Sequence, residues 1–428
     1  MQNTWPLEWD TLIEILRREV KPALGCTEPI AVALAAAHCR ERLGAVPERL
    51  QVWVSGNLFK NGMGVGVPGT GMTGLPIAAA VGAVAGVASA GLEVLKAITA
   101  ADVDQARNLL AQTQLDVKDV PEVLYVEVLA TRATQQQVRC VICTDHTRVV
   151  LLEHNGEVVQ QQSRDPGVVL TSTPRLSLGA IIEFACQVPY ERIAFIREAA
   201  ELNQALADEG LRGYGLSIGR MLTEQIERRL LSDDLMTLAM RLASAASDAR
   251  MDGAMLPAMS NSGSGNQGIA ATMPVVAAAR FLGADDERLC RALVMSHLLA
   301  IHIKTYQNKL SALCAASTAA MGAGAAITWL LGGNPQQISL CINNMIGDVA
   351  GIICDGAGSA CSMKVSTSAS AAVKAALMAV NGFGISAREG IVCDDAEQTI
   401  ANLGHLSREG MQQTDQQIIA IMRAKQTQ

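Results

Sequence analysis

The chain has 428 residues, of which 50% are hydrophobic and 18% are charged, and its net charge is −7. It has no basic run and no stripe of aromatic and arginine residues, which argues against a nucleic-acid partner. Charged residues usually make up about a quarter of a globular chain, and aromatic residues are only 3% here against 37 glycines. We therefore expect a closely packed, mostly helical interior built from small side chains.

The first hundred residues predict three helices and one strand. Residues 7–20 have the pattern of an amphipathic helix. KPALGCTEP (21–29) is predicted as a turn in which Thr27 caps a second helix. RLQVWVSGN (49–57) alternates like a strand, and a glycine-rich loop over 62–74 leads into an alanine-rich helix.

Two uncharged stretches, LPIAAAVGAVAGVASAGL (75–92) and residues 310–347, have the length of membrane spans. They are rich in Ala and Gly, no Trp or Tyr belt flanks the first, and LLGGNPQQ interrupts the second. Buried helices explain them better, so we expect no membrane partner. The N-terminal MQNTWPLEWDTL lacks the apolar segment of a signal peptide, which predicts a cytoplasmic protein with reduced cysteines.

Residues 120–162 alternate with a period of two, and Asn155-Gly156 is a strong hairpin signal. From about residue 177 the pattern is helical almost to the end. The predicted fold class is α+β, with a large, mostly helical body and a small antiparallel β subdomain inserted in the N-terminal half. The expected parts are an N-terminal helical part with a glycine-rich loop (1–115), the β subdomain (116–165) and a helical catalytic part (166–428).

Three segments match G-x-G-x-x-G, namely 64–69, 69–74 and 263–268. None follows a strand directly within a βαβ unit, so we do not expect a dinucleotide site. SNSGSGNQG, however, leads into a long apolar helix, whose free N–H groups and dipole favour an anion. A tight turn with a helix cap is the alternative. The residues expected to bind this anion, a carboxylate or a phosphate, are Ser262, Gly263, Ser264, Gly265 and Asn266.

Most of the eleven cysteines are predicted to be structural. Cys140 and Cys143 form a C-x-x-C on a predicted strand, where positions three apart point to opposite faces and cannot share a metal without a bulge. Five others, with apolar or structural surroundings, are expected to fill space: Cys39, Cys186, Cys290, Cys341 and Cys393.

Four cysteines remain as candidates for chemistry. Cys354 and Cys361 lie in IICDGAGSACSMK, a glycine-rich loop that we expect to enter a helix near Met363, and Cys314 lies in KLSALCAAS. The wide spacing without histidine suits three thiolate ligands of a [4Fe–4S] cluster better than a tetrahedral zinc site. Cys26 precedes a helix N-terminus, where we expect the helix dipole to lower the thiol pKa.

Long motifs of this chain resemble the L-cysteine desulfidase family (UPF0597), which is related to the iron–sulfur L-serine dehydratases. The similar segments are KPALGCTEP, SGNLFKNGMGVGVPGTGM, SNSGSGNQG, LSALCA and CDGAGSACSMK. The resemblance implies a [4Fe–4S] lyase that degrades L-cysteine to pyruvate, ammonia and hydrogen sulfide. It places the cluster ligands at Cys314, Cys354 and Cys361, and it suggests that Cys26 is a proton acceptor.

Other assignments stay open at this stage. Lys364 and Lys60 are alternative bases, although each has a plainer interpretation as the partner of a carboxylate or of solvent, and His297 is expected to be a satisfied core histidine. L-serine dehydratase activity, a non-catalytic iron–sulfur redox sensor and a pyridoxal-phosphate lyase using Lys60 are the alternative functions. The expected partner is a small amino-acid substrate, and the helical surface is compatible with a homodimer.

Overall fold

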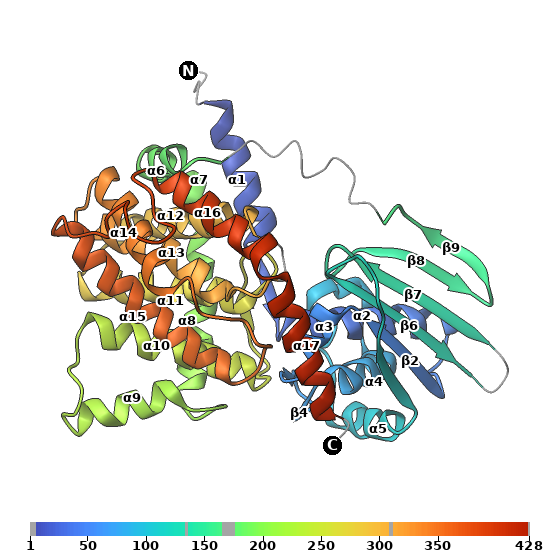
Figure 1. The fold of residues 1–428 in the computed structure, drawn as a ribbon. Coiled ribbons are helices and arrows are strands. Elements are labelled where there is room, and N and C mark those ends of the chain that lie inside the picture. The colour runs from blue at the N-terminus through green and yellow to red at the C-terminus, as the bar shows by residue number, and fades with distance from the viewer. Residues whose placement is uncertain (1–5, 133–135, 165–175, 308–310, 427–428) are drawn as a thin grey trace.

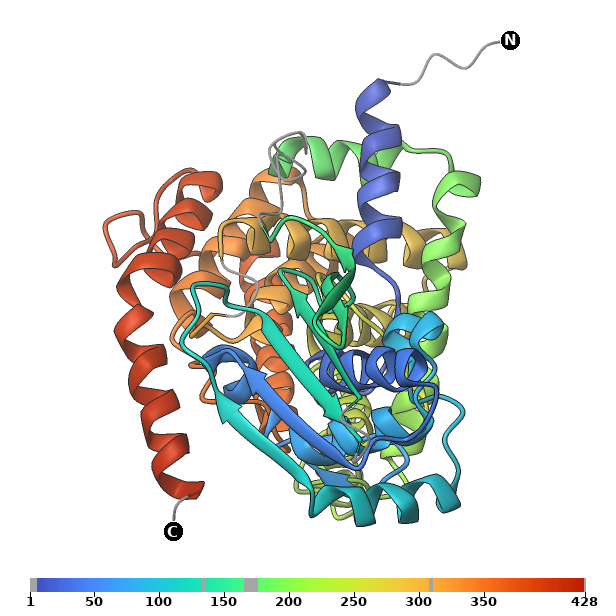
Figure 2. The ribbon, with the colours of Figure 1, turned by 90° about the vertical axis from the view of Figure 1, so that its right-hand side faces the viewer.

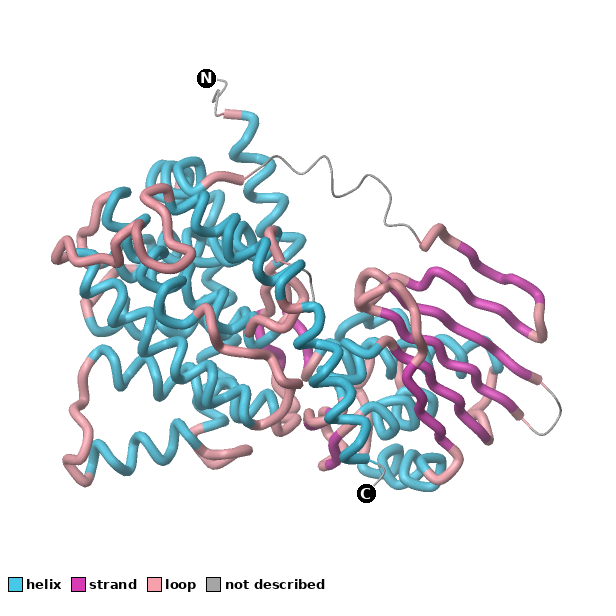
Figure 3. The backbone as a smooth tube through the Cα atoms, in the orientation of Figure 1, coloured by secondary structure: helices cyan, strands magenta, loops and turns pink. Residues whose placement is uncertain are grey.

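The computed structural model describes residues 6–132, 136–164, 176–307 and 311–426, and they form two bodies (Figure 1). One body is helical with a single large apolar core, and the other is built on a sheet with its own core. Figure 3 shows nearly all strands gathered in the second body. The predicted α+β class with a mostly helical body is therefore confirmed. Residues 1–5 and residue 310, used in the predictions on the N-terminus and the second uncharged stretch, lie outside the described residues.

The sheet body contains a six-stranded sheet in the order β5-β2-β6-β7-β8-β9. β2 pairs parallel with β5, and the other neighbours are antiparallel. The inward side chains of these strands pack against α2 and α4. In chain order this body consists of α2 (Thr27–Leu43), β2 (Arg49–Val54), α3 (Gly56–Gly62), β3 (Gly66–Val67), β4 (Met72–Thr73), α4 (Leu75–Ala85), a 3-10 segment (Ala88–Glu93), α5 (Ala100–Leu110), β5 (Thr113–Val117), β6 (Tyr125–Thr131), β7 (Gln137–Cys143), β8 (Val149–His154) and β9 (Glu157–Gln161).

This sheet is larger than the antiparallel subdomain expected over 116–165. The strand predicted over 49–57 is confirmed as β2, and it joins this sheet because β5 and β6 pair its backbone groups on its two sides. The Asn155-Gly156 turn is confirmed, since both residues have positive φ, 52° and 86°, between β8 and β9.

The helical body packs its helices through small residues. α13 passes so close to α12 that a Cβ on Gly322 would lie 2.3 Å from the carbonyl oxygen of Ser296. In chain order this body consists of α1 (Leu7–Glu19), α6 (Leu178–Gln187), α7 (Tyr190–Ile193), a 3-10 turn (Ala194–Ile196), α8 (Arg197–Gly210), α9 (Ile218–Glu227), α10 (Leu235–Met251), α11 (Gly265–Phe281), α12 (Asp286–Thr305), α13 (Ala315–Leu330), α14 (Pro335–Val349), α15 (Ala360–Val380), α16 (Ala396–His405) and a π-helical turn (Leu406–Gly410).

The two bodies are joined by pairings between segments far apart in sequence. β1 (Pro22–Leu24) pairs antiparallel with β10 (Pro257–Met259). β1 lies between α1 and α2 in the chain, so this pairing holds the segment that connects the two helices. The last helix, α17 (Gln412–Gln426), packs on α3 and runs along the sheet body (Figure 2). Since α1 contributes to the helical core, the predicted parts 1–115, 116–165 and 166–428 do not coincide with the two cores.

Three local predictions need correction. The helix expected over 75–92 ends at Ala85, because Gly86 leaves the helical conformation. Cys26, not Thr27, is the N-cap of α2. The helix after the glycine loop begins at Ala360, earlier than expected. Among the described residues, no helix is long and apolar enough to cross a membrane.

The close contact between α12 and α13 predicts that Gly322→Ala destabilises the fold by about 1–3 kcal/mol, because the added methyl group must displace backbone. Gly179→Ala in α6 is the matched control, since a Cβ there meets nothing within 4 Å and alanine favours a helix by up to about 1 kcal/mol. Urea denaturation monitored by circular dichroism measures both. Equal stability of the two variants would contradict the packing.

Candidate active site

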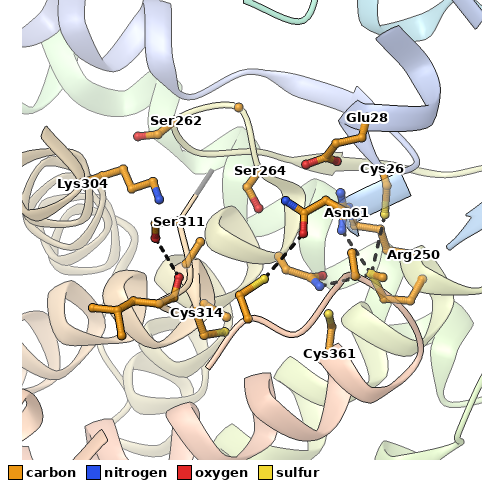
Figure 4. Close-up of a pocket in the computed structure, with 18 of the residues that line it drawn as sticks. Cys26, Glu28, Asn61, Arg250, Ser262, Ser264, Lys304, Ser311, Cys314 and Cys361 are labelled. Carbon is orange, nitrogen blue, oxygen red and sulfur yellow. Dashed lines mark hydrogen bonds between the residues drawn. The ribbon is translucent and has the colours of Figure 1, made fainter. Parts of the chain in front are cut away.

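One pocket lies between the helical body and the sheet body, and Figure 4 shows its walls. It encloses about 760 Å³ of space outside the protein atoms, including some open solvent. The four cysteines singled out from the sequence, Cys26, Cys314, Cys354 and Cys361, all line it. So do Ser262, Gly263, Ser264 and Asn266 of the glycine-serine loop. Segments that are remote in sequence therefore converge on one space.

Backbone pairing brings Cys314 and Cys354 together. Leu313 and Ile353 form an antiparallel bridge, in which the Cys314 N–H donates to the carbonyl of Ile352 at 3.0 Å and the Cys354 N–H donates to that of Ala312 at 2.7 Å. Cys361 follows in the first turn of α15. The three thiols therefore sit on two short segments whose backbones are fixed relative to each other, although forty residues separate Cys314 from Cys354.

The loop that carries Cys354 is also fixed to the sheet body. Gly64 and Gly358 form a parallel bridge, and Lys60 Nζ donates to the carbonyl of Cys354 at 3.0 Å. The same ammonium forms an ion pair of 2.6 Å with Asp415 of α17. Lys60 is fully buried and does not line the pocket, so the plainer interpretation of a solvated surface lysine was wrong. Its contacts make it a tie between α3, the cysteine loop and the last helix.

The glycine-serine loop forms the N-terminus of α11, as expected. Ser264 is the N-cap, and its Oγ accepts a hydrogen bond from the N–H of Gln267. Two of the predicted side-chain donors are used inside the protein, because Ser262 Oγ donates to Asn261 Oδ1 and Asn266 Nδ2 donates to the Met251 sulfur. Within the described residues, nothing accepts from the backbone N–H groups of Gly265 and Asn266. These two backbone N–H groups can therefore donate hydrogen bonds to a bound anion.

His297 holds this loop in place from the core. Asn261 Nδ2 donates to His297 Nδ1 at 3.0 Å, and Thr272 Oγ1 lies 3.0 Å from Nε2 and itself donates to the carbonyl of Gly268. This pattern assigns the proton of the neutral ring to Nε2. Burial lowers the pKa of His297 to about 3, so the ring stays neutral, as expected for a core histidine.

Burial raises the thiol pKa values in the pocket. It raises that of Cys26 to about 11, although Arg250 lowers it, and that of Cys361 to about 12. It also raises the pKa of Cys354, which Lys60 opposes. The lowered pKa expected for Cys26 was therefore wrong, because the loss of hydration outweighs the helix dipole. A cationic group would be needed to hold several such thiols together as thiolates.

The alternative base Lys364 is engaged elsewhere. Its ammonium donates to the carbonyl of Ile353 and to the carboxylate of Asp355, and it does not line the pocket. Burial would lower the pKa of Lys364, but the Asp355 contact outweighs it and leaves the pKa raised. Neither Lys364 nor Lys60 lines the pocket, and the ammonium group of each is paired with a carboxylate.

Three charged pocket residues were missed by the sequence analysis: Glu28, Arg250 and Lys304. Burial lowers the pKa of Lys304 to about 8, an effect that nearby Cys354 and Cys314 oppose. No described residue accepts a hydrogen bond from Lys304 Nζ. The sequence did contain a signal for two of them. Lys304 in LLAIHIK and Arg250 in ASAASDARM are charged residues within otherwise apolar or alanine-rich helices, where charged side chains are uncommon.

Among the described residues, no three His, Cys, Asp or Glu side chains lie close enough to bind a single metal ion. Cys140 and Cys143 belong to different apolar clusters on the two sides of β7. The two thiols therefore have different surroundings, as expected for positions three apart on a strand.

Comparisons with known proteins give a consistent result. The family model described as serine dehydratase alpha chain matches residues 89–420. A UPF0597 protein of Aeromonas hydrophila is 72% identical over 98% of this chain and 97% of its own length. A UPF0597 protein of Photobacterium profundum is 54% identical over 97% of this chain and 98% of its own, and the UPF0597 protein YhaM of Escherichia coli has the same values.

The buried ion pair between Lys60 and Asp415 predicts that Asp415→Asn strongly lowers the free energy of unfolding. The substitution leaves a buried ammonium without its carboxylate, which costs about 3–5 kcal/mol. Asp348→Asn is the control, because the Lys374–Asp348 pair is partly exposed and such pairs contribute about 1 kcal/mol or less. Chemical denaturation measures both. If Asp415→Asn cost no more than Asp348→Asn, the tie would not hold the loop.

Because His297 is buried and neutral, we expect part of the free energy of unfolding to depend on pH. Since its folded-state pKa lies below the unfolded value of 6.5, the unfolded chain binds the extra proton between about pH 3 and 6.5. Stability is therefore lost as the pH falls below 6.5, by up to about 1.4 kcal/mol per pH unit. His297→Gln should remove this part of the slope. Denaturation midpoints of both proteins at pH 7.5, 6.5 and 5.5 measure it, and parallel curves would contradict the assignment.

Proposed function

The chain belongs to the serine dehydratase alpha-chain family, in its UPF0597 branch, and from this premise we propose that it is a lyase that degrades L-cysteine to pyruvate, ammonia and hydrogen sulfide. The observation that carries the proposal is the single pocket lined by Cys26, Cys314, Cys354 and Cys361 together with the N-terminus of α11. A small amino acid with a β-leaving group suits a pocket that offers both soft ligands and charged groups.

We propose that Cys314, Cys354 and Cys361 hold a [4Fe–4S] cluster. The donor set fits this group, because three thiols line one pocket and cysteine thiolates are the protein ligands of such clusters. Lysines also surround the thiols, since Lys60 acts on Cys354 and Lys364 acts on Cys314 and Cys361. When bound, a cluster with three protein ligands supplies a Lewis-acidic iron atom for the leaving group of the substrate.

The reaction is a β-elimination followed by hydrolysis. Loss of the α-proton and of the β-sulfur gives aminoacrylate and hydrogen sulfide, and addition of water to the tautomer of aminoacrylate releases ammonia and pyruvate. The chain has to orient the α-carbon, hold the charges of the amino acid and accept one proton. Pocket residues from both bodies are available for these tasks.

We propose that Cys26 Sγ accepts the α-proton. It stands at the N-cap of α2, where Arg250 and Glu28 both act on its pKa, and its Sγ donates to the Met251 sulfur at 3.7 Å. Burial raises the pKa of this thiol to about 11, and Arg250 beside it acts in the opposite direction, toward the thiolate that a base requires. Lys304 is the alternative acceptor, because it lines the same pocket and burial lowers its pKa to about 8, toward the neutral amine that can take a proton.

L-serine dehydratase activity is the second candidate, because the family model bears the name of that enzyme. A hydroxyl group can bind the same iron atom as a thiolate, although a sulfur-rich site favours the softer thiolate. Pyruvate formation from L-cysteine and from L-serine, measured as kcat/KM on one anaerobic preparation, decides between them.

The proposed ligands predict which cysteines retain iron. After anaerobic reconstitution, Cys314→Ser, Cys354→Ser and Cys361→Ser should lose most iron, acid-labile sulfide and visible absorbance, because serine oxygen is a poorer iron ligand than thiolate. Cys26→Ser should keep the cluster and lose about 10²- to 10⁴-fold in kcat, the usual contribution of a positioned base.

Cys186→Ser is the control, since Cys186 lies on α6 away from the pocket and should keep both cluster and activity. A wild-type protein that binds no iron would end the cluster proposal. A protein that binds the cluster but releases neither sulfide nor pyruvate would instead favour a redox sensor.

A further inference from the structure

The charges at one end of the pocket are arranged for a zwitterion. Figure 4 shows Glu28, Cys26 and Arg250 at one side of the pocket, with Lys304, Ser311 and Cys314 at the other. Glu28 and Arg250 reach this side from different bodies, since Glu28 is in the first turn of α2 and Arg250 is in the last turn of α10. Cys26, the proposed base, lies with them.

Arg250 is a buried cation that lacks an anionic partner among the described residues. Its side chain is only 5% exposed, and the Nε atom is buried without an acceptor. The guanidinium donates at 3.4 Å to the sulfur of Met251, which is a weak acceptor. Burying a guanidinium without a carboxylate or carbonyl is costly. A ligand that carries a carboxylate would supply the acceptor that the Arg250 guanidinium lacks.

The surroundings of Arg250 suit a carboxylate. The side chain crosses the N-terminus of α11, where a Cβ on Gly265 would lie 2.0 Å from Arg250 Nε. The backbone N–H groups of Gly265 and Asn266 are open there, and the helix dipole is positive at this end. A planar carboxylate can accept two parallel hydrogen bonds from one guanidinium. The lack of a Cβ at Gly265 is what admits the guanidinium to this position.

Glu28 supplies the opposite charge. It is 9% exposed, accepts a hydrogen bond from Thr27 Oγ1 at 3.2 Å, and forms no ion pair within 4.0 Å with any described residue. Glu28 and Arg250 therefore do not neutralise each other, although both line the pocket. Two separated and uncompensated charges of opposite sign match the ammonium and carboxylate groups of a free α-amino acid.

We propose that Arg250 binds the α-carboxylate and Glu28 the α-ammonium of the substrate, which sets the substrate class as free α-amino acids with a short β-leaving group. This inference rests on the proposed function, because it assumes that the third attachment is the leaving group at the cysteine-lined side. With both charges held, the α-carbon stands beside Cys26. Three fixed attachments also select one enantiomer.

The experiment compares three thiols that differ only in their charged groups. L-cysteine has both groups, 3-mercaptopropionate lacks the amine, and cysteamine lacks the carboxylate. Dissociation constants are measured by calorimetry under anaerobic conditions, on the reconstituted protein and on the protein without cluster. Arg250→Gln should weaken L-cysteine and 3-mercaptopropionate by about 10- to 150-fold, the range for hydrogen bonds to charged groups, and leave cysteamine within about twofold.

Glu28→Gln should show the reverse pattern, weakening L-cysteine and cysteamine and sparing 3-mercaptopropionate. Arg280→Gln is the control, because Arg280 is bonded to Gln204 on the surface and should change none of the three constants. Arg250→Lys should recover part of the affinity, since it keeps the charge but not the paired donors. It also replaces Arg250→Gln if thermal melting shows that the glutamine variant is unfolded.

The outcomes separate this inference from the proposed reaction. The crossed pattern supports the inference even if the protein binds no iron and releases no sulfide, because binding and not turnover is measured. Equal losses for all three thiols in Arg250→Gln and Arg250→Lys would mean that Arg250 acts only on the fold, and they would overturn it. Unchanged affinity of cysteamine in Glu28→Gln would overturn the ammonium assignment.

Discussion

The pocket depends on one constraint, which is that two short backbone segments of the helical body are paired with each other and then tied to the sheet body. The bridge between Leu313 and Ile353 brings the neighbouring residues Cys314 and Cys354 together. The ammonium of Lys60 then fixes the same loop to α3 and α17 through Cys354 and Asp415. Backbone hydrogen bonds and a buried ion pair are directional, so they fix side-chain positions more closely than apolar packing alone.

The two bodies contribute different chemistry to the pocket. The helical body brings three thiols, the amide groups of α11 and the cations Arg250 and Lys304, while the sheet body brings Cys26, Glu28 and Asn61. Neither body alone surrounds a small molecule with both charges and soft ligands. The short β1–β10 pairing is therefore more than a connection, because it sets Cys26 beside the loop that begins α11. Which residues meet in the pocket therefore depends on where they lie relative to the β1–β10 pairing.

The sequence predicted the features that depend on local chemistry. Glycines and serines before an apolar helix identified the start of α11, and Asn155-Gly156 identified a turn. The convergence of the cysteines was predicted from their residue types, their spacing and the family resemblance, not from geometry. The pKa of Cys26 was predicted wrongly, because its burial depends on Met251 and Val65, which come from other elements. Arg250 and Lys304 were missed because a helical pattern does not say which charged side chain faces a pocket.

The last helix has a consequence for how the protein is made. Asp415 contacts Lys60 and Asn57, more than 350 residues earlier in the chain, and α1 packs into a core whose other helices follow residue 176. Domains often fold as they leave the ribosome, but here the first helix must wait for helices that follow residue 176, and the cysteine loop must wait for Asp415. The contacts that hold this loop are therefore completed only after α17 has been made, although Cys26 and Lys60 are synthesised hundreds of residues earlier.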